Sequence, residues 1–119
     1  MKFYFAPMEG LTGYIYRNAH REHFPVGIDK YFSPFIFASQ SDSLKAREMK
    51  DILPENNRGI ALIPQLLTNN ADDFIHTAKK LSHLGYCEIN LNLGCPAGTV
   101  VSKGRGSGFL AKKAELDAF

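Results

Sequence analysis

The sequence predicts an α/β fold in which strands and helices alternate, either an open parallel sheet or a (β/α)8 barrel of the TIM type. Three observations support this fold. Four short segments of strand character are each followed by a segment of helical character. The links between them are short and contain proline or glycine. The run Ile60–Ile63 is apolar, as expected of a parallel strand that is buried on both faces.

The four expected strands end where a proline or a glycine prevents further pairing. In chain order they cover Lys2–Ala6, Asp29–Phe32, Gly59–Gln65 and Tyr86–Leu93. Pro7 closes the first strand, Pro34 stops the second, and Gly94 follows the fourth. Catalytic and binding residues of α/β folds gather at such strand ends, so candidate site residues are sought there.

Four helices are expected between and after these strands. They cover Gly13–His23, Asp42–Leu53, a segment from Asn69 or Asn70 to about Leu84, and Phe109–Phe119. Thr12 can cap the first helix, and Ile15 and Ala19 share one face of it. Gly85 follows the third helix, where a left-handed residue commonly ends a helix.

The length sets the expected domain organisation. A complete TIM barrel needs ~250 residues, whereas this chain has 119, so its strand–helix units make about half of a barrel. We therefore expect residues 1–119 to be the N-terminal part of a barrel domain in a longer protein.

Composition narrows the setting. No apolar run approaches the ~18 residues of a membrane span, so no membrane partner is expected. The net charge of +2 neither requires nor forbids an RNA partner. Cys87 and Cys95 lack metal-ligand spacing and cannot form a disulfide framework, which favours a reducing, cytoplasmic setting. Four histidines lie on or near expected helices, also without metal spacing: His20, His23, His76 and His83.

The fourth strand separates polar from apolar residues, because side chains alternate across a strand. Its polar face holds Glu88, Asn90 and Asn92, and its other face holds Cys87, Ile89, Leu91 and Leu93. Amides inside a barrel are costly without partners. They indicate either a bound polar ligand or hydrogen bonds among themselves.

Several strand-end residues have both a structural and a functional interpretation. Cys95 is either a buried small hydrophobe or a reactive thiol, whereas Cys87 is expected in the core. Gln65 either makes a hydrogen bond at the barrel rim or contacts a cofactor. Pro7 and Met8 either simply end a strand or bring their backbone against a flat ring.

The glycine-rich loop Lys103–Gly108 precedes the last expected helix. Glycines permit close approach of the backbone and a helix N-terminus attracts anions, so the loop is a weak phosphate signal. It matches neither a Walker loop nor a dinucleotide-binding fingerprint. A mobile, solvated loop is at least as consistent with its composition.

In combination, these segments resemble the tRNA-dihydrouridine synthases. The segments that carry the resemblance are Ala6–Thr12, Tyr16-Arg17, Pro64–Leu66, Asn90–Pro96 and Lys103–Gly108. They occur in the family's order and extend over essentially the whole chain. Gly13 departs from the family pattern, where an aspartate is common, and Tyr16 stands where phenylalanine is common.

The resemblance implies an FMN-containing (β/α)8 barrel that reduces uridine in tRNA, with NADPH as the hydride source and a helical tRNA-binding domain after the barrel. The residues it implies are Pro7, Met8, Glu9 and Gln65 for the flavin, Cys95 as general acid, Asn92 for flavin or uracil, and Lys103 and Arg105 near RNA phosphate. The resemblance further implies hydride transfer to C6 of the uracil and proton donation to C5 by the thiol.

Two alternatives remain open at this stage. One is another FMN barrel that reduces free pyrimidines, and the other is a half barrel without catalytic activity. We expect the full-length protein to be a monomer. We expect residues 1–119 alone to bind FMN poorly, to lack activity and to self-associate, because a half barrel exposes sheet edges.

Overall fold

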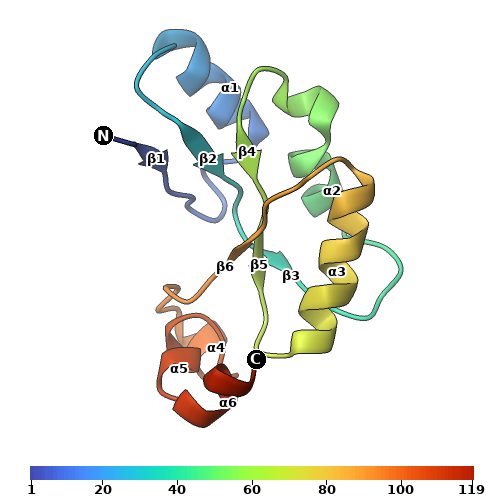
Figure 1. Ribbon diagram of the computed structural model, residues 1–119. Helices are drawn as coiled ribbons and strands as arrows, with labels where there is room; N and C mark the ends of the chain where they lie inside the picture. Colours follow the sequence, from blue (N-terminus) through green and yellow to red (C-terminus); the bar gives the residue numbers. More distant parts are fainter.

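The computed structural model describes residues 1–119 and has parallel strands flanked by helices (Figure 1). Its strands form two three-stranded sheets in which every neighbouring pair is parallel. The first has the order β1 (Tyr4–Phe5), β2 (Lys30–Phe32), β4 (Leu62–Ile63). The second has the order β3 (Ile36–Phe37), β5 (Gln65–Leu67), β6 (Asn90–Leu91). The predicted parallel α/β fold is confirmed, and the strands of this chain do not close into a barrel.

Proline divides the third expected strand into two parts, and an additional short strand follows the second expected strand after Pro34. Pro34 separates β2 from β3, and Pro64 separates β4 from β5, because proline has no N–H group to donate to a ladder. The Ser33 side chain bridges the break: its Oγ accepts the N–H of Gln65 at 3.1 Å. The prediction that Gln65 ends a strand is therefore wrong, since Gln65 begins β5. The predicted end of the second strand at Phe32 is confirmed, whereas β3 was not predicted.

Helices connect the strands and follow the last of them. They are α1 (Tyr14–His23), α2 (Ala46–Ile52), the 3₁₀ helix η1 (Pro54–Asn57), α3 (Ala71–His83), α4 (Gly98–Val101), α5 (Ser107–Leu110) and α6 (Lys113–Ala118). Asn70 caps α3 by accepting the N–H of Asp73, and Gly85 adopts φ +95° after it, so the third helix is confirmed with both end signals. The single helix expected over 109–119 is instead divided between α5 and α6.

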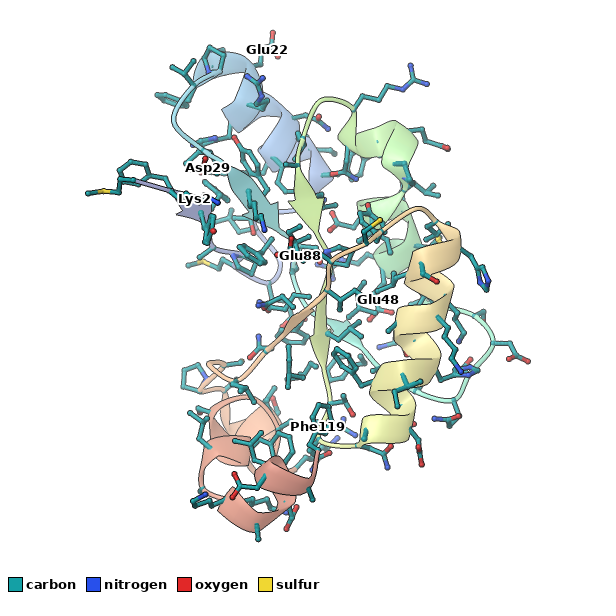
Figure 2. All side chains as sticks on the ribbon, viewed as in Figure 1. Lys2, Glu22, Asp29, Glu48, Glu88 and Phe119 are labelled. Carbon is teal, nitrogen blue, oxygen red and sulfur yellow. The ribbon has the colours of Figure 1, made fainter.

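Figure 1 shows α4, α5 and α6 grouped beyond the end of β6, at the foot of the view. Phe119, labelled in Figure 2, packs edge-on against Phe74 of α3 and Phe109 of α5, with ring centroids 5.7 and 5.5 Å apart. This aromatic contact attaches the C-terminal group of helices to α3. None of the helices combines the length and apolar character needed to cross a lipid bilayer.

The hydrophobic core lies between the sheets and the helices. Its buried residues are Tyr31, Ile36, Ala38, Ile52, Leu62, Leu66 and Leu81. Cys87 is exposed, so its predicted place in the core is wrong. The reason is that β6 covers only Asn90–Leu91. Cys87 lies before this strand, so the alternation of faces expected from Tyr86 onward does not apply to it. The neighbouring Glu88, which is also exposed (Figure 2), pairs with Lys30 of β2 at 2.6 Å.

Helix α1 buries an arginine instead of its apolar residues. Ile15 is 70% exposed, whereas Arg17 is fully buried. The guanidinium donates to the Thr12 carbonyl at 2.9 Å, to Asp51 Oδ2 at 3.0 Å and to Asn57 Oδ1 at 2.9 Å. Arg17 thus fastens α1 to α2 and η1 through directional bonds.

Thr12 has a different role from the predicted one. The residue at the N-cap of α1 is Gly13, and no side chain caps this helix. The Thr12 Oγ accepts the N–H of Met8 at 2.7 Å and donates to the Met8 carbonyl at 3.2 Å. Thr12 therefore fixes the loop that follows β1.

Replacing Arg17 by methionine should destabilise the protein strongly. Asp51 and Asn57 would lose their cationic partner, and breaking a buried pair of this kind costs about 3 kcal/mol. Chemical unfolding followed by circular dichroism measures the loss. The matched control is Arg47→Met on the exposed side of α2, which should stay within about 0.5 kcal/mol. Equal effects of the two substitutions would contradict the role given to Arg17.

Candidate active site

A pocket of about 550 Å³ lies where four segments of the chain meet. It is lined by Pro7, Met8, Glu9, Pro34, Phe35, Gln65 and the stretch from Asn90 to Pro96. Six of the eight predicted site residues are in this lining: Pro7, Met8, Glu9, Gln65, Asn92 and Cys95. The fold thus brings together the predicted site residues of three segments that are far apart in the sequence.

A chain of side-chain amide hydrogen bonds connects lining residues on one wall of the pocket. The side chain of Gln65, a residue only 8% exposed, donates from Nε2 to Asn90 Oδ1 at 2.8 Å. Its Oε1 accepts the Nδ2 group of Asn92 at 2.7 Å. The amides therefore bond to one another, which is one of the two interpretations that the sequence left open. The Nδ2 group of Asn90 makes no hydrogen bond within the protein and remains available to a ligand.

Asn92 also shapes the turn that carries the cysteine. Its Oδ1 accepts the N–H groups of Gly94 at 3.1 Å and Cys95 at 2.9 Å. Because the same side chain donates to Gln65, the position of Cys95 is tied to β5. Cys95 is half-buried, and its thiol has no hydrogen-bond partner in the protein. It is thus not a fully buried core residue.

The opposite wall is the loop after β1. Thr12 occupies both polar groups of the Met8 backbone, as described above, whereas the Glu9 N–H and the Pro7 carbonyl have no partner within the protein. Gly10 adopts φ +79°, which lets the chain turn from this loop toward α1. Residues 7–9 thus line the pocket with Met8 held by Thr12.

Lys103 and Arg105 lie outside this pocket. Arg105 donates from Nε to Asn69 Oδ1 at 3.4 Å, and Asn69 donates to the Lys103 carbonyl at 3.2 Å. Lys103 is exposed and Arg105 is half-buried. Both residues thus belong to a separate surface that is joined to the link between β5 and α3.

The glycine-rich loop is packed, not solvated, because Gly104 and Gly106 are buried. Helix α5 does not present free amides either. The N–H groups of Ser107, Gly108 and Phe109 donate to the carbonyls of Cys95, Arg105 and Gly106. A phosphate site made by the backbone at this helix end is therefore not available, and any phosphate contact has to come from side chains.

Three groups have shifted pKa values, and none of them lines the pocket. The hydrogen bond that Lys30 donates to the Glu88 carboxylate raises the pKa of Lys30. Burial raises the pKa of Tyr31 and of Tyr86, whose hydroxyl donates to the Ile52 carbonyl. These shifts accompany structural contacts, namely the burial of two tyrosines and the pairing of Lys30 with Glu88.

The sequence pattern left seven of the 13 lining residues without a role, among them Pro34, Phe35 and Asn90. Pro34 lies at an expected strand end but was assigned no role, and Phe35 lies beyond that end, between β2 and β3. Asn90 shares the polar face of the fourth strand with Asn92, so the alternation did carry a signal for it. That its Nδ2 group is free follows only from the hydrogen bond between Gln65 and the Asn90 Oδ1, which the sequence does not reveal.

Replacing Asn92 by alanine should loosen the turn that holds Cys95. The Gly94 and Cys95 amides would lose their acceptor, and a loss of about 1.4 kcal/mol corresponds to roughly tenfold faster hydrogen exchange. Asn92→Asp keeps the accepting oxygen and should preserve much of the protection. Exchange measured at these two amides tests this, with Asn56→Ala as the control at a distant site. Unchanged exchange in Asn92→Ala would contradict the role of the side chain.

Comparisons with known proteins identify the family. The family model for dihydrouridine synthase (Dus) matches residues 4–118. A "Probable tRNA-dihydrouridine synthase" of Staphylococcus aureus (strain N315) is 26% identical over 114 residues, covering 92% of this chain and 33% of the relative. A "Probable tRNA-dihydrouridine synthase 1" of Synechocystis sp. is 24% identical over 113 residues, covering 95% of this chain and 31% of the relative. The chain spans about a third of the length of these curated relatives. Because the family model matches nearly the whole chain, the chain belongs to the dihydrouridine synthase family.

Proposed function

We propose that this chain supplies part of the active site of an FMN-dependent enzyme that reduces uridine to 5,6-dihydrouridine in tRNA. The observation that carries the proposal is the placement of Cys95 in one pocket with the amides of β5 and β6 and the loop after β1. The names of the relatives point to the same reaction. NADPH is the proposed reductant, and the cytoplasm is the proposed location.

The pocket lining suits a flat, partly polar ring such as that of FMN. Pro7, Met8 and Leu93 offer apolar contacts, and the free Nδ2 group of Asn90 offers a donor. Gln65 Nε2 uses one of its two hydrogens on Asn90, so the second can bond to the ring. Because the N–H and the carbonyl of Met8 already bond to the Thr12 hydroxyl, Met8 would contact the ring through its side chain. The Glu9 N–H would then be the backbone group that donates to the ring.

The reaction divides between the cofactor and the thiol. FMN, when bound and reduced, supplies the hydride that reaches C6 of the uracil. Cys95 donates a proton to C5, which neutralises the charge that the hydride brings, and the thiolate then recovers a proton from water. The Asn92 turn holds the sulfur at the pocket wall, and Asn92 is also proposed to contact the uracil. Because the thiol bonds to no protein group, its proton is free for transfer.

We further propose that residues 1–119 are the N-terminal half of a (β/α)8 barrel, with a second half and a helical tRNA-binding domain elsewhere in the protein. The parallel pairing and the sequential order of the strands support this. So does the concentration of exposed hydrophobic side chains at β1 and α1: Met1, Phe3, Tyr4, Met8, Leu11, Ile15, Tyr16, Phe24 and Val26. Closing a barrel would cover such a face.

The substrate base must leave the RNA stack to enter a pocket of this kind. Lys103 and Arg105 are proposed to contact RNA phosphate from the neighbouring surface, which would position the tRNA without reading the base. Their separation from the pocket is consistent with that division of roles. We propose that the full-length protein acts as a monomer.

Cys95→Ala in the full-length protein should lower turnover of unmodified tRNA by about 10²–10⁴-fold, the usual contribution of a general acid. Flavin binding, read from its visible absorbance, should persist because the thiol is only one element of the wall. Cys87→Ala is the matched control and should leave turnover unchanged, since Cys87 is exposed and outside the pocket. Retained turnover in Cys95→Ala would remove Cys95 from the acid role.

Residues 1–119 expressed alone should bind FMN poorly, show no turnover and self-associate. The reason is that one third of the relatives' length carries only part of the pocket and leaves apolar side chains uncovered. Flavin absorbance and size-exclusion chromatography provide the readouts. A yellow, active monomer would contradict the half-barrel proposal. Turnover of free uridine by the full-length protein, without tRNA binding, would favour a pyrimidine reductase instead.

A further inference from the structure

The glycine-rich loop packs directly on the cysteine that lies at the wall of the pocket. The Cys95 carbonyl accepts two hydrogen bonds from Ser107, one from its N–H at 3.0 Å and one from its Oγ at 3.1 Å. No other residue of the loop bonds to the Cys95 turn. The cysteine is therefore held from both sides, by Asn92 through its N–H and by Ser107 through its carbonyl.

Gly106 is required by the closeness of this packing. A Cβ atom at Gly106 would lie 2.6 Å from the Cys95 carbonyl oxygen and 3.1 Å from the Cys95 Cβ. Its φ of +56° is also a conformation that other residues rarely adopt. A side chain here would push on the backbone of Cys95 itself, which cannot move aside as the end of a long side chain can.

The loop is anchored independently of the cysteine. Phe109, two residues after Ser107, is fully buried. Asn69, in the link between β5 and α3, forms hydrogen bonds with both Lys103 and Arg105. The Arg105 N–H also donates to the Val100 carbonyl at 3.2 Å. A segment fixed at these points can impose a position on Cys95 instead of following it.

We propose that residues 103–108 are a positioning element for the Cys95 thiol, in which Gly106 and Ser107 set where the sulfur lies in the pocket. This inference rests on the proposed function only in taking Cys95 as the proton donor. This role belongs to Gly106 and Ser107 and is separate from the phosphate contacts proposed for the side chains of Lys103 and Arg105.

The test compares two variants of the loop with two matched controls in the full-length protein. Gly106→Ala introduces the clashing Cβ, and its control is Gly98→Ala, where a Cβ meets nothing within 4 Å. Ser107→Ala removes one bond to Cys95, and its control is Ser102→Ala at an exposed position near the loop. Ser107→Thr restores the hydroxyl and serves as the rescue variant.

The first readout does not depend on activity. Alkylation by iodoacetamide is followed separately at the two cysteines by peptide mass spectrometry, with the exposed Cys87 as internal reference. Gly106→Ala should raise the ratio of Cys95 to Cys87 alkylation several-fold, and Ser107→Ala should raise it less. Gly98→Ala, Ser102→Ala and Ser107→Thr should leave the ratio unchanged.

The second readout separates positioning from RNA binding. Misplacing a reacting group by about 1 Å can cost on the order of 10²-fold, so Gly106→Ala should lower kcat by about 10- to 100-fold. The KM for tRNA should change little, and Ser107→Thr should recover the kcat that Ser107→Ala loses. An unchanged alkylation ratio and kcat in both loop variants would overturn the proposal, as would a raised KM with kcat retained.

The two proposals fail in different ways. If Cys95→Ala keeps full turnover, the acid role is lost, yet the alkylation ratio still decides whether the loop positions the thiol. If Gly106→Ala does not fold, Ser107→Ala and its threonine rescue decide the question alone, because Ser107→Ala removes only one hydroxyl.

Discussion

The buried side chain of Gln65 needs partners for both ends of its amide, and Asn90 of β6 and Asn92 just after it provide them. A buried amide without hydrogen bonds is costly, so the bonds to Asn90 and Asn92 are a condition for placing a glutamine at the start of β5. They also fix the register in which Gln65 faces Asn90 and Leu66 faces Leu91. A shift by one residue would turn leucines toward the amide and asparagines toward the core.

The arrangement of the pocket follows from this register. Asn92 reaches Gln65 with its Nδ2 group, which leaves its Oδ1 to form the turn of Gly94 and Cys95. On the other wall, Arg17 holds the Thr12 carbonyl, and the Thr12 hydroxyl holds Met8. One wall is thus fixed by Gln65, a buried polar side chain that itself lines the pocket, and the other by the buried Thr12 and Arg17 behind its lining residues. Rigid support of this kind is what a site needs if reacting groups are to be aligned before the substrate arrives.

Local signals in the sequence were sufficient for some elements. Asn70 and Gly85 mark the two ends of α3 correctly, because capping depends on residues close in the chain. The strand ends also located most of the pocket lining, since parallel strands bring their ends to a common edge.

Other features depend on distant partners and were not predictable from local pattern. Arg17 is buried because Asp51 and Asn57 lie opposite it, and a helical periodicity that counts apolar residues assigns the wrong inner face to α1. The break at Pro64 is tolerated because Ser33 replaces a backbone acceptor there. The packing of the glycine-rich loop on Cys95 likewise joins two segments whose contact no spacing rule describes. The functional roles of the pocket residues remain predictions.

Helix α1 turns its cation inward and its isoleucine outward, and this inversion has a consequence for the order of assembly. The partners of Arg17 lie no further along the chain than Asn57, so the inner contacts of α1 can form as soon as that segment has left the ribosome. The apolar outer face must wait for whatever covers it. The hydrogen bonds of Arg17 would thus set the orientation of α1 early in synthesis, and the burial of its apolar outer face would follow later. An intermediate with an oriented helix but an exposed apolar face is the species that chaperones recognise.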